Sequence, residues 1–475
     1  MNPLARLVFP ALRWRPRTGF SHERNVIAQT LKLGVGGYIL FGGTIKGARE
    51  LTQQLRRASP YPLLIGSDFE RGAGQQITGL TDLPPPAALG FIGKPALTAR
   101  CGAITAREAM SVGVNWVFAP VADLDAEPEN PIVQTRSFGD VPATVSDHVT
   151  HWIIAAQKEG ATATAKHYPG HGRTLTDSHA TLPRVDASFE TLAANDLAPF
   201  QAAVAAGARS VMSAHVAYPG WDPSGLPATL SQPILDYLRT SLGFDGLIVT
   251  DALIMEGALR GGSGENASVQ AIAAGADALL YPSDPVRVVH ALEAARDKTL
   301  TAERLDEARE RVEKLAAEAS VASHVARSGA VPSSNDQAFA AAVADLSTHV
   351  LRGDHLNLRG PIQVTPIDDD VGGPYVIHGR DVFARTLREL GVRSAPGGSR
   401  AVIVFSEPRS WKSRAGFGPA TVEALNRVAP HAALFILFGH PRLLAGLPEG
   451  PPVLCAWHGQ ALMQAAAARW VVKRL

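Results

Sequence analysis

The 475-residue sequence contains only two cysteines, Cys101 and Cys455, which lie far apart along the chain. A disulfide framework is therefore excluded, and the thiol content suits a reducing compartment. Long apolar runs are also missing, since none approaches the roughly 20 residues that a membrane-spanning helix needs. The first 17 residues carry four arginines and only a short, interrupted apolar stretch, which is not typical of a secretory signal. We expect a soluble, cytoplasmic protein with no membrane partner.

The chain also has little excess charge of either sign. Its 45 lysines and arginines nearly balance 44 aspartates and glutamates, and the basic residues are dispersed. No surface for nucleic acid is therefore predicted. No Walker motif occurs, and no G-x-G-x-x-G follows the first strand-like run of the C-terminal part, so we predict no nucleotide cofactor. A small neutral or mildly charged ligand is the better expectation.

Buried strands are the main structural signal in the first 320 residues. Continuous apolar runs indicate strands that are buried on both faces, as in a parallel sheet. Eight such runs, separated by helical segments, favour a (β/α)8 barrel of the TIM type over an open doubly wound sheet. The runs are 4–9, 37–41, 62–67, 114–119, 162–166, 210–214, 246–250 and 278–281.

The pattern changes after the eighth run, and the length of the chain already favours two domains. A stretch at about 318–339, rich in serine and alanine and poor in large apolar residues, predicts a linker. We therefore expect a barrel domain at 1–325 and a smaller α/β sandwich domain at 340–475. The strand-like runs of the second domain are 375–378, 401–405, 432–437 and 453–456.

Residues 166–179 crowd polar side chains into one segment, KHYPGHGRTLTDSH. Its glycines and proline break any helix or strand, and loops on a rigid scaffold often carry catalytic groups. Three of its side chains, His167, His171 and His179, are possible zinc ligands. Their spacing matches no common zinc site, and no nearby cysteine supports one, so we expect no metal.

Acid–base chemistry is the alternative for this loop. A carboxylate that accepts a hydrogen bond from one ring nitrogen of a histidine favours the imidazolium, and Asp177 lies two residues before His179. A second carboxylate, Asp251, directly follows the buried run 246–250, where it is either a helix N-cap or a functional group. An ionised aspartate opposite a protonated histidine is the pair that retaining glycoside cleavage needs.

Further polar residues follow the predicted strands, where barrel enzymes carry their sites. Four segments, SDFERG from Ser67, NWVFAPVAD with RSFG, the 166–179 loop and TDAL from Thr250, occur in an order that resembles glycoside hydrolase family 3. Within that family the chain is most similar to the β-N-acetylglucosaminidase branch in its two-domain form. The Lys-His-Tyr-Pro-Gly-His-Gly…Asp-Ser-His block is the most specific part of the resemblance.

The resemblance implies a retaining hydrolase with Asp251 as nucleophile and His179 as general acid/base, assisted by Asp177. It further implies that the substrate is a small carbohydrate, an N-acetylglucosaminide, and that peptidoglycan recycling is the setting. The residues expected to hold the sugar hydroxyls at the nonreducing end are Asp68, Arg136, Lys166 and His167, with His215 as a wall of the same pocket.

Two positions depart from the family pattern: Gln76 replaces a frequent arginine, and Ala252 replaces a second aspartate. Three competing functions stay open. A family-3 β-glucosidase would use an acidic residue from elsewhere as its acid/base. A phosphorylase would use phosphate as acceptor, since a neutral histidine does not repel it. A noncatalytic sugar-binding protein would keep the barrel without turnover.

Overall fold

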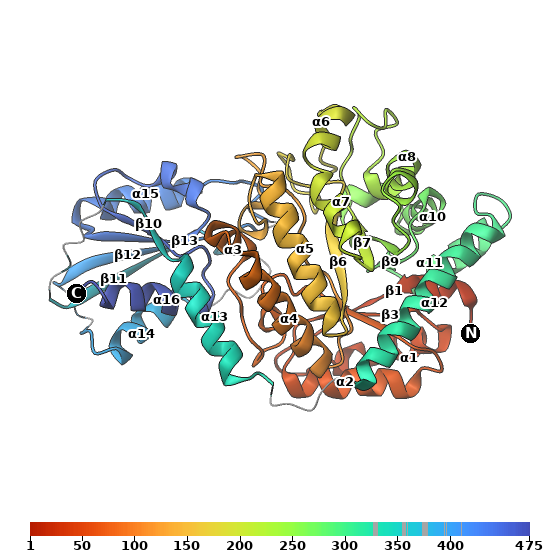
Figure 1. Ribbon diagram of the computed structural model, residues 1–475, viewed down its shortest axis with the longest axis horizontal. Helices are drawn as coiled ribbons and strands as arrows, with labels where there is room; N and C mark the ends of the chain where they lie inside the picture. Colours follow the sequence, from red (N-terminus) through yellow and green to blue (C-terminus); the bar gives the residue numbers. More distant parts are fainter. Residues whose placement is uncertain are drawn as a thin grey trace.

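The N-terminal part of the chain forms a barrel whose wall is a curled sheet of parallel strands (Figure 1). The computed structural model describes residues 1–325, 331–353, 358, 360–372, 379–393, 395, 397–409 and 411–475. In the main sheet each strand is hydrogen bonded to the next one along the chain, so every connection is a crossover. These strands are β2 (Ala11–Arg13), β3 (Gly37–Phe41), β4 (Leu64–Ser67), β5 (Trp116–Val117), β6 (Thr162–Tyr168), β7 (Ser210–Ser213) and β8 (Leu247–Thr250).

Two short strands, β1 (Val8–Phe9) and β9 (Leu279–Leu280), pair in parallel and close the barrel. On one side of this pair, Ala278 forms a bridge with Val249 of β8. On the other side β1 continues into β2 after Pro10, whose carbonyl accepts a hydrogen bond from β3. Proline has no amide hydrogen, so it interrupts the strand without leaving a buried donor unpaired. The barrel predicted from the sequence is confirmed.

Helices cover the outside of this barrel (Figure 1). They are α1 (Arg24–Leu33), α2 (Ile45–Ala58), α3 (Pro86–Ile92), α4 (Pro95–Ser111), α5 (Pro142–Lys158), α6 (Phe189–Ala194), α7 (Ala198–Ala205), α8 (Gln232–Asp236), α9 (Glu256–Leu259), α10 (Gly264–Ala274), α11 (Pro285–Ala295) and α12 (Ala302–Val325). None of the helices in the described parts of the chain is long and apolar enough to span a bilayer.

The strand-like runs from 37–41 to 278–281 all contain strands of the structure. The first run, 4–9, is wrong over most of its length, because Pro3–Leu7 form a 3-10 helix. The side chain of Asn2 caps this helix by accepting the N–H of Leu4, and proline is favoured at such a start. The sequence does not predict β2, since this strand is short and only its middle residue is buried.

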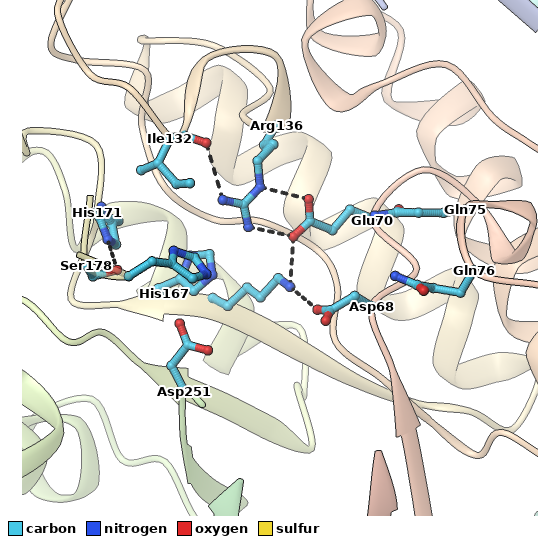
Figure 2. Close-up of a pocket in the computed structure, with 12 residues that line it drawn as sticks. Asp68, Glu70, Gln75, Gln76, Ile132, Arg136, His167, His171, Ser178 and Asp251 are labelled. Atoms are coloured by element: carbon cyan, nitrogen blue, oxygen red, sulfur yellow. Dashed lines mark hydrogen bonds and ion pairs between the residues drawn. The ribbon is translucent and has the colours of Figure 1, made fainter. Parts of the chain in front are cut away.

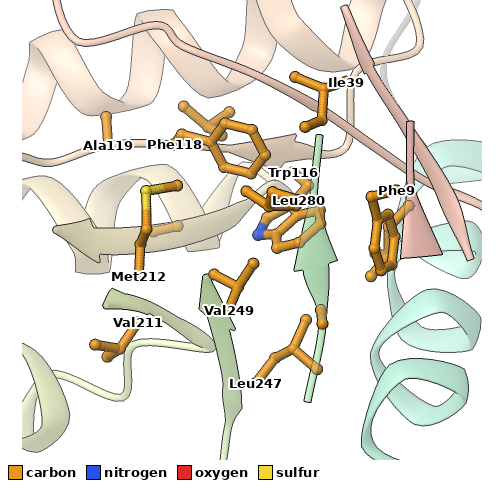
Figure 3. Packing of buried hydrophobic residues seen from close by; sticks show 14 of the residues in the cluster. Phe9, Ile39, Trp116, Phe118, Ala119, Val211, Met212, Leu247, Val249 and Leu280 are labelled. Carbon is orange, nitrogen blue, oxygen red and sulfur yellow. The ribbon is translucent and has the colours of Figure 1, made fainter. Parts of the chain in front are cut away.

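Large apolar side chains fill the interior of the barrel (Figure 3). Trp116 of β5 is fully buried and meets the rings of Phe9 and Phe118 edge-on, at centroid distances of 5.2 and 4.9 Å. Its indole N–H donates to the hydroxyl of Thr164 at 2.9 Å, so the polar atom of this ring is satisfied. A Cβ at Gly66 would lie 2.4 Å from the Phe118 ring. Such dense packing fixes the strand ends that carry the site.

The second domain is an α/β sandwich, drawn in teal to blue in Figure 1. In its described residues the sheet order is β10-β14-β13-β12-β11, with β10 antiparallel to β14 and the other neighbours parallel. One face of the sheet packs against α14 and α16, and the other packs against α15. The elements are β10 (His349–Arg352), β11 (Ile362–Asp368), β12 (Ser399–Ser406), β13 (Leu434–Gly439), β14 (Val453–Cys455), α13 (Ser334–Ser347), α14 (Val382–Glu389), α15 (Pro419–Val428) and α16 (Ala461–Val472).

The predicted second-domain runs 401–405, 432–437 and 453–456 correspond to β12, β13 and β14. The run at 375–378 lies outside the described residues. The sequence does not predict β11, because most of its residues are only half-buried and it contains an exposed proline, Pro366. A strand at the edge of a sheet tolerates both features.

Helices occupy most of the described part of the predicted linker at about 318–339. α12 continues to Val325, and Ala319 is fully buried against the barrel. α13 then begins at Ser334. The scarcity of large apolar residues is a poor guide to a linker here, because alanine has the highest helix propensity of all residues. The predicted linker is therefore largely helical in its described residues.

Side chains of α13 contact both domains. Ala340 and Val343 belong to the core cluster of the barrel. Ala344, one turn further, packs with Ala88 of α3 and Met463 of α16 in a separate cluster between the domains. We propose domain limits close to 1–325 and 340–475, with α13 as the bridge.

Candidate active site

A cavity of about 250 Å³ opens where the strands β4, β6 and β8 end, and charged side chains line it (Figure 2). The lining residues are Asp68, Glu70, Gln75, Gln76, Ile132, Arg136, Lys166, His167, His171, Ser178, His179 and Asp251. Six of the eight site residues predicted from the sequence are in this set; Asp177 and His215 are not. A polar pocket of this size at the carboxyl end of a barrel is suited to a small polar ligand.

Four charged side chains form one network on a wall of this cavity (Figure 2). Lys166 donates through Nζ to Asp68 Oδ1 at 2.6 Å and lies 2.8 Å from Glu70 Oε1. Arg136 donates two parallel hydrogen bonds to the Glu70 carboxylate, at 2.9 and 2.8 Å. This bidentate geometry fixes both partners. The network presents a carboxylate, an ammonium and a guanidinium to the cavity.

Burial and neighbouring charges set the protonation of this network. Burial would raise the pKa of Glu70, but Arg136 and Lys166 hold this pKa well below its usual range. For Lys166, burial would lower the pKa, whereas Asp68 and Glu70 together raise it. Glu70 is therefore an anion and Lys166 a cation at neutral pH.

His167, at the end of β6, is held by a buried carboxylate behind it. Asp123 is inaccessible to solvent, and its Oδ2 lies 2.7 Å from Nδ1 of His167. Its Oδ1 accepts the backbone N–H groups of His167 and His171 at 3.1 and 2.7 Å. With Nδ1 bound to Asp123, only Nε2 of His167 is left to meet a ligand in the cavity.

Asp251 follows β8 directly, and its carboxylate points into the cavity (Figure 2). The backbone N–H of Ala252 donates to its Oδ1 at 2.7 Å. Burial would raise the pKa of Asp251, but His167, His215, this N–H and His179 lower it to about 2. The group is therefore ionised at neutral pH, as a nucleophile must be.

His179 lies on the loop after β6 and faces the same cavity. Its Nδ1 is 2.7 Å from Oδ1 of Asp177, and its backbone N–H donates to the same oxygen at 2.9 Å. Burial would lower the pKa of His179, yet hydrogen bonding and charge from Asp177, with the charge of Asp251, raise it. Asp177 itself is buried behind the ring. The arrangement favours the imidazolium and leaves Nε2 as the ring nitrogen that can meet a ligand in the cavity.

His215 is not in the wall of the cavity, so its predicted position is corrected. The side chain is fully buried, with Nδ1 2.9 Å from Thr229 Oγ1 and Nε2 3.1 Å from the carbonyl of Ala252. Both ring nitrogens are therefore engaged, and Nε2 must carry hydrogen to donate to that carbonyl. Burial lowers the pKa of His215. One of these two contacts is with the backbone of Ala252, beside Asp251, so His215 is a supporting residue.

His171 is likewise engaged within the loop. Its Nδ1 is 2.9 Å from Thr174 Oγ1, and its Nε2 is 3.0 Å from Ser178 Oγ. Burial lowers the pKa of His171 to about 4, so the ring is neutral at pH 7. Within the described residues no group of three or more histidine, cysteine or acidic side chains is arranged to hold a metal ion.

Glu70 is the main residue of the site that the sequence does not predict. It lies two residues after Asp68 in the same segment, SDFERG, and its burial at 8% side-chain exposure is visible only in the fold. A weak signal is present, since Glu70 is the second carboxylate of a segment that carries the family resemblance. Gln76, one of the two departures, lines the cavity and accepts the N–H of Gly42 at 3.0 Å.

An ionised carboxylate, a histidine–aspartate pair and a wall of charged groups lie together at the mouth of a barrel, as in a glycoside hydrolase. The chain belongs to glycosyl hydrolase family 3, whose N-terminal domain matches residues 12–315.

Three known proteins are similar to this chain. A β-N-acetylglucosaminidase/β-glucosidase of Cellulomonas fimi is 34% identical over 306 residues, which make up 62% of this chain and 54% of that protein. A β-hexosaminidase of Idiomarina loihiensis is 35% identical over 269 residues, or 55% of this chain and 80% of that one. The structure of a family-3 β-N-acetylglucosaminidase from Paenibacillus sp. str. FPU-7 is 27% identical, with a TM-score of 0.87, and the match covers 100% of this chain and 96% of that one.

Proposed function

We propose that this protein is a retaining, exo-acting β-N-acetylglucosaminidase that removes terminal N-acetylglucosamine from the nonreducing end of its substrate. One observation carries the proposal: the cavity that Asp251 enters as an anion is also faced by His179, whose partner Asp177 favours the protonated ring. The names of the Cellulomonas, Idiomarina and Paenibacillus relatives agree with the substrate class.

The mechanism that we propose has two steps. In the first, a carboxylate oxygen of Asp251 attacks the anomeric carbon, the bond from that carbon to the leaving oxygen breaks, and His179 Nε2 gives its proton to the leaving oxygen. In the second, neutral His179 takes a proton from water, which attacks the anomeric carbon and releases Asp251. Asp68, Arg136, Lys166 and His167 hold the hydroxyl groups of the ring during both steps.

Phosphorolysis is the second candidate, and the character of the acid/base group favours it over a β-glucosidase or a noncatalytic sugar-binding protein. Once His179 has given up its proton it is neutral, so it does not repel an incoming phosphate as a carboxylate would. The product would then be a sugar 1-phosphate in place of a free sugar.

One activity screen tests these proposals together. Aryl β-N-acetylglucosaminide and aryl β-glucoside are incubated with the enzyme, with and without inorganic phosphate, and the sugar product and its anomeric configuration are followed by NMR. We expect N-acetylglucosamine released first as the β anomer, at a rate independent of phosphate. If sugar 1-phosphate is the main product, the proposed hydrolysis is wrong and the activity is phosphorolysis. A preference for the glucoside, or no turnover of either substrate, would contradict the proposed activity.

A further inference from the structure

A second cavity, of about 140 Å³, lies between the two domains and adjoins the candidate active site. Both cavities are lined by Glu70, Gln75 and Arg136, so the Glu70–Arg136 ion pair is a common wall. The barrel adds Arg71 to the second cavity, and the second domain adds Arg409. We call this space the interdomain cavity.

Two guanidinium groups, one from each domain, meet in the interdomain cavity. Their side chains are largely buried, at 13% exposure for Arg71 and 17% for Arg409. Burial lowers the pKa of Arg71, and the proximity of the positive charge on Arg409 lowers it further, against the influence of Asp82 and Glu407. Two like charges brought together in a partly dry space attract an anion between them.

On the side of the second domain, Arg409 keeps N–H groups that can still donate hydrogen bonds. Arg409 donates through Nη2 to Glu407 Oε2 at 2.5 Å, whereas its Nε is buried and lacks a hydrogen-bond partner among the described residues. The Glu407 carboxylate is also met by the N–H of Gly459 at 2.8 Å and lies 3.3 Å from Nε2 of His458. This carboxylate is shared among several donors and therefore cannot accept all five N–H groups of the Arg409 guanidinium.

The interdomain cavity is separate from the reaction centre. The Glu70–Arg136 pair lies across the active site from Asp251 (Figure 2). A ligand behind this pair is on the wrong side to attack the anomeric carbon, so the cavity is suited to recognition and not to the chemical step.

We propose that the interdomain cavity binds a small anionic group, a carboxylate or a phosphate, between Arg71 of the barrel and Arg409 of the second domain. The second domain then has a direct part in ligand recognition at the edge of the sugar pocket. Two sources can supply this anion: an acidic substituent of the substrate, placed away from the anomeric carbon, or a free anion in solution.

Binding of free anions tests the site without any turnover. The thermal unfolding midpoint and calorimetric binding are measured with sodium acetate and with sodium phosphate, against sodium chloride at equal ionic strength. We expect saturable stabilisation by acetate or phosphate and about tenfold weaker binding in Arg409→Gln and Arg71→Gln, since each removes one charged donor group. Arg427→Gln, on an exposed ion pair of α15, is the control and should bind as the wild type does.

Wild-type enzyme that responds to these anions no more than to chloride, or Arg409→Gln that binds them unchanged, would overturn the proposal. Arg409→Lys provides a second variant in case Arg409→Gln does not fold. It keeps the charge but loses the planar fork, so we expect affinity between those of the wild type and Arg71→Gln.

A matched substrate pair identifies the source of the anion, and this arm alone rests on the proposed function. Two aryl N-acetylglucosaminides are prepared, one with an O-carboxymethyl group on the sugar ring and one with the neutral methyl ester of that group. The value of kcat/KM is compared between the two. A preference for the acid that disappears in Arg409→Gln supports a substrate-borne group. Equal rates together with saturable anion binding support a free anion. Anion binding without any glycoside turnover would contradict the proposed function and leave the anion site supported.

Discussion

The Nδ1 atom of His179 lies 2.7 Å from Oδ1 of Asp177, and the same oxygen accepts the backbone N–H of His179. The carboxylate is thereby fixed relative to both the ring and the backbone of the loop. Because Asp177 is buried at 1% side-chain exposure while 45% of the His179 side chain is exposed, the pair has an anchored end and an accessible end. This geometry is compatible with the role of proton donor that we propose for His179.

Substitution of Asp251 by asparagine should abolish turnover while the sugar still binds. The amide keeps the size of the side chain but is not a nucleophile, so we expect kcat to fall at least about 1,000-fold. Single-turnover kinetics and calorimetric binding of N-acetylglucosamine measure the two effects separately. Residual kcat within tenfold of the wild type would exclude Asp251 as the nucleophile.

Removal of the imidazole in His179→Ala should affect substrates according to their leaving group. General acid catalysis contributes about 100- to 10,000-fold when the leaving oxygen needs a proton, and little when the leaving group is an activated phenol. We expect a loss of that order on an alkyl glycoside and a much smaller one on a nitrophenyl glycoside. Equal losses on both would argue against the role of His179 as the acid.

In Asp177→Asn the alkaline limb of the pH profile should move to lower pH. Asp177 raises the pKa of His179, and loss of the carboxylate charge removes that effect while burial continues to lower the pKa. The active imidazolium is then lost at lower pH, which the dependence of kcat/KM on pH measures. Asp186→Asn is a control, because Asp186 forms an exposed ion pair with Arg184 on the same loop region. An unchanged limb in Asp177→Asn would show that Asp177 does not set this pKa.

Glu70 is predicted to be a positioning residue for Arg136 and Lys166. Glu70→Gln leaves the buried Lys166 and the half-buried Arg136 without their shared carboxylate, and breaking a buried ion pair in this way costs about 3–5 kcal/mol of stability. Misplaced cations should also raise KM for the glycoside more than they lower kcat, which a purely structural loss would not do. Urea unfolding and steady-state kinetics measure both. Glu423→Gln, on the exposed pair with Arg427, should change stability by less than about 0.5 kcal/mol.

Gly66→Ala tests the packing under the site. The new Cβ would lie 2.4 Å from the fully packed Phe118 ring, so the ring or the strand must shift. We expect a loss of about 1–3 kcal/mol in the free energy of unfolding, measured with denaturant. Gly416→Ala, where a Cβ meets nothing within 4 Å, is the matched control. Equal stabilities of the two variants would show that β4 adjusts freely.

Local sequence was informative for four residues at strand ends. Asp68, Lys166, His167 and Asp251 each lie at or just after a continuous apolar run, and in the structure all of them line one cavity. The parallel barrel explains this, since it brings the carboxyl ends of all its strands to the same face.

Local sequence was less informative for residues whose role depends on distant partners. His215 also follows a strand, but it turns away from the cavity to meet Thr229 and the backbone of Ala252. The helical content of the predicted linker depends in the same way on contacts with the barrel, because Ala319 is buried there. A residue pattern does not contain these contacts.

Periodicity, strand ends and the 166–179 block are local features, so the sequence alone predicts the barrel, the second α/β domain and the residues of the proposed chemistry. How the charges are shared depends on the three-dimensional fold. It placed Glu70 between Arg136 and Lys166, and it brought Arg71 and Arg409 together from positions more than 300 residues apart. Charge interactions depend on distance and burial in three dimensions, and neither is fixed by spacing along the chain.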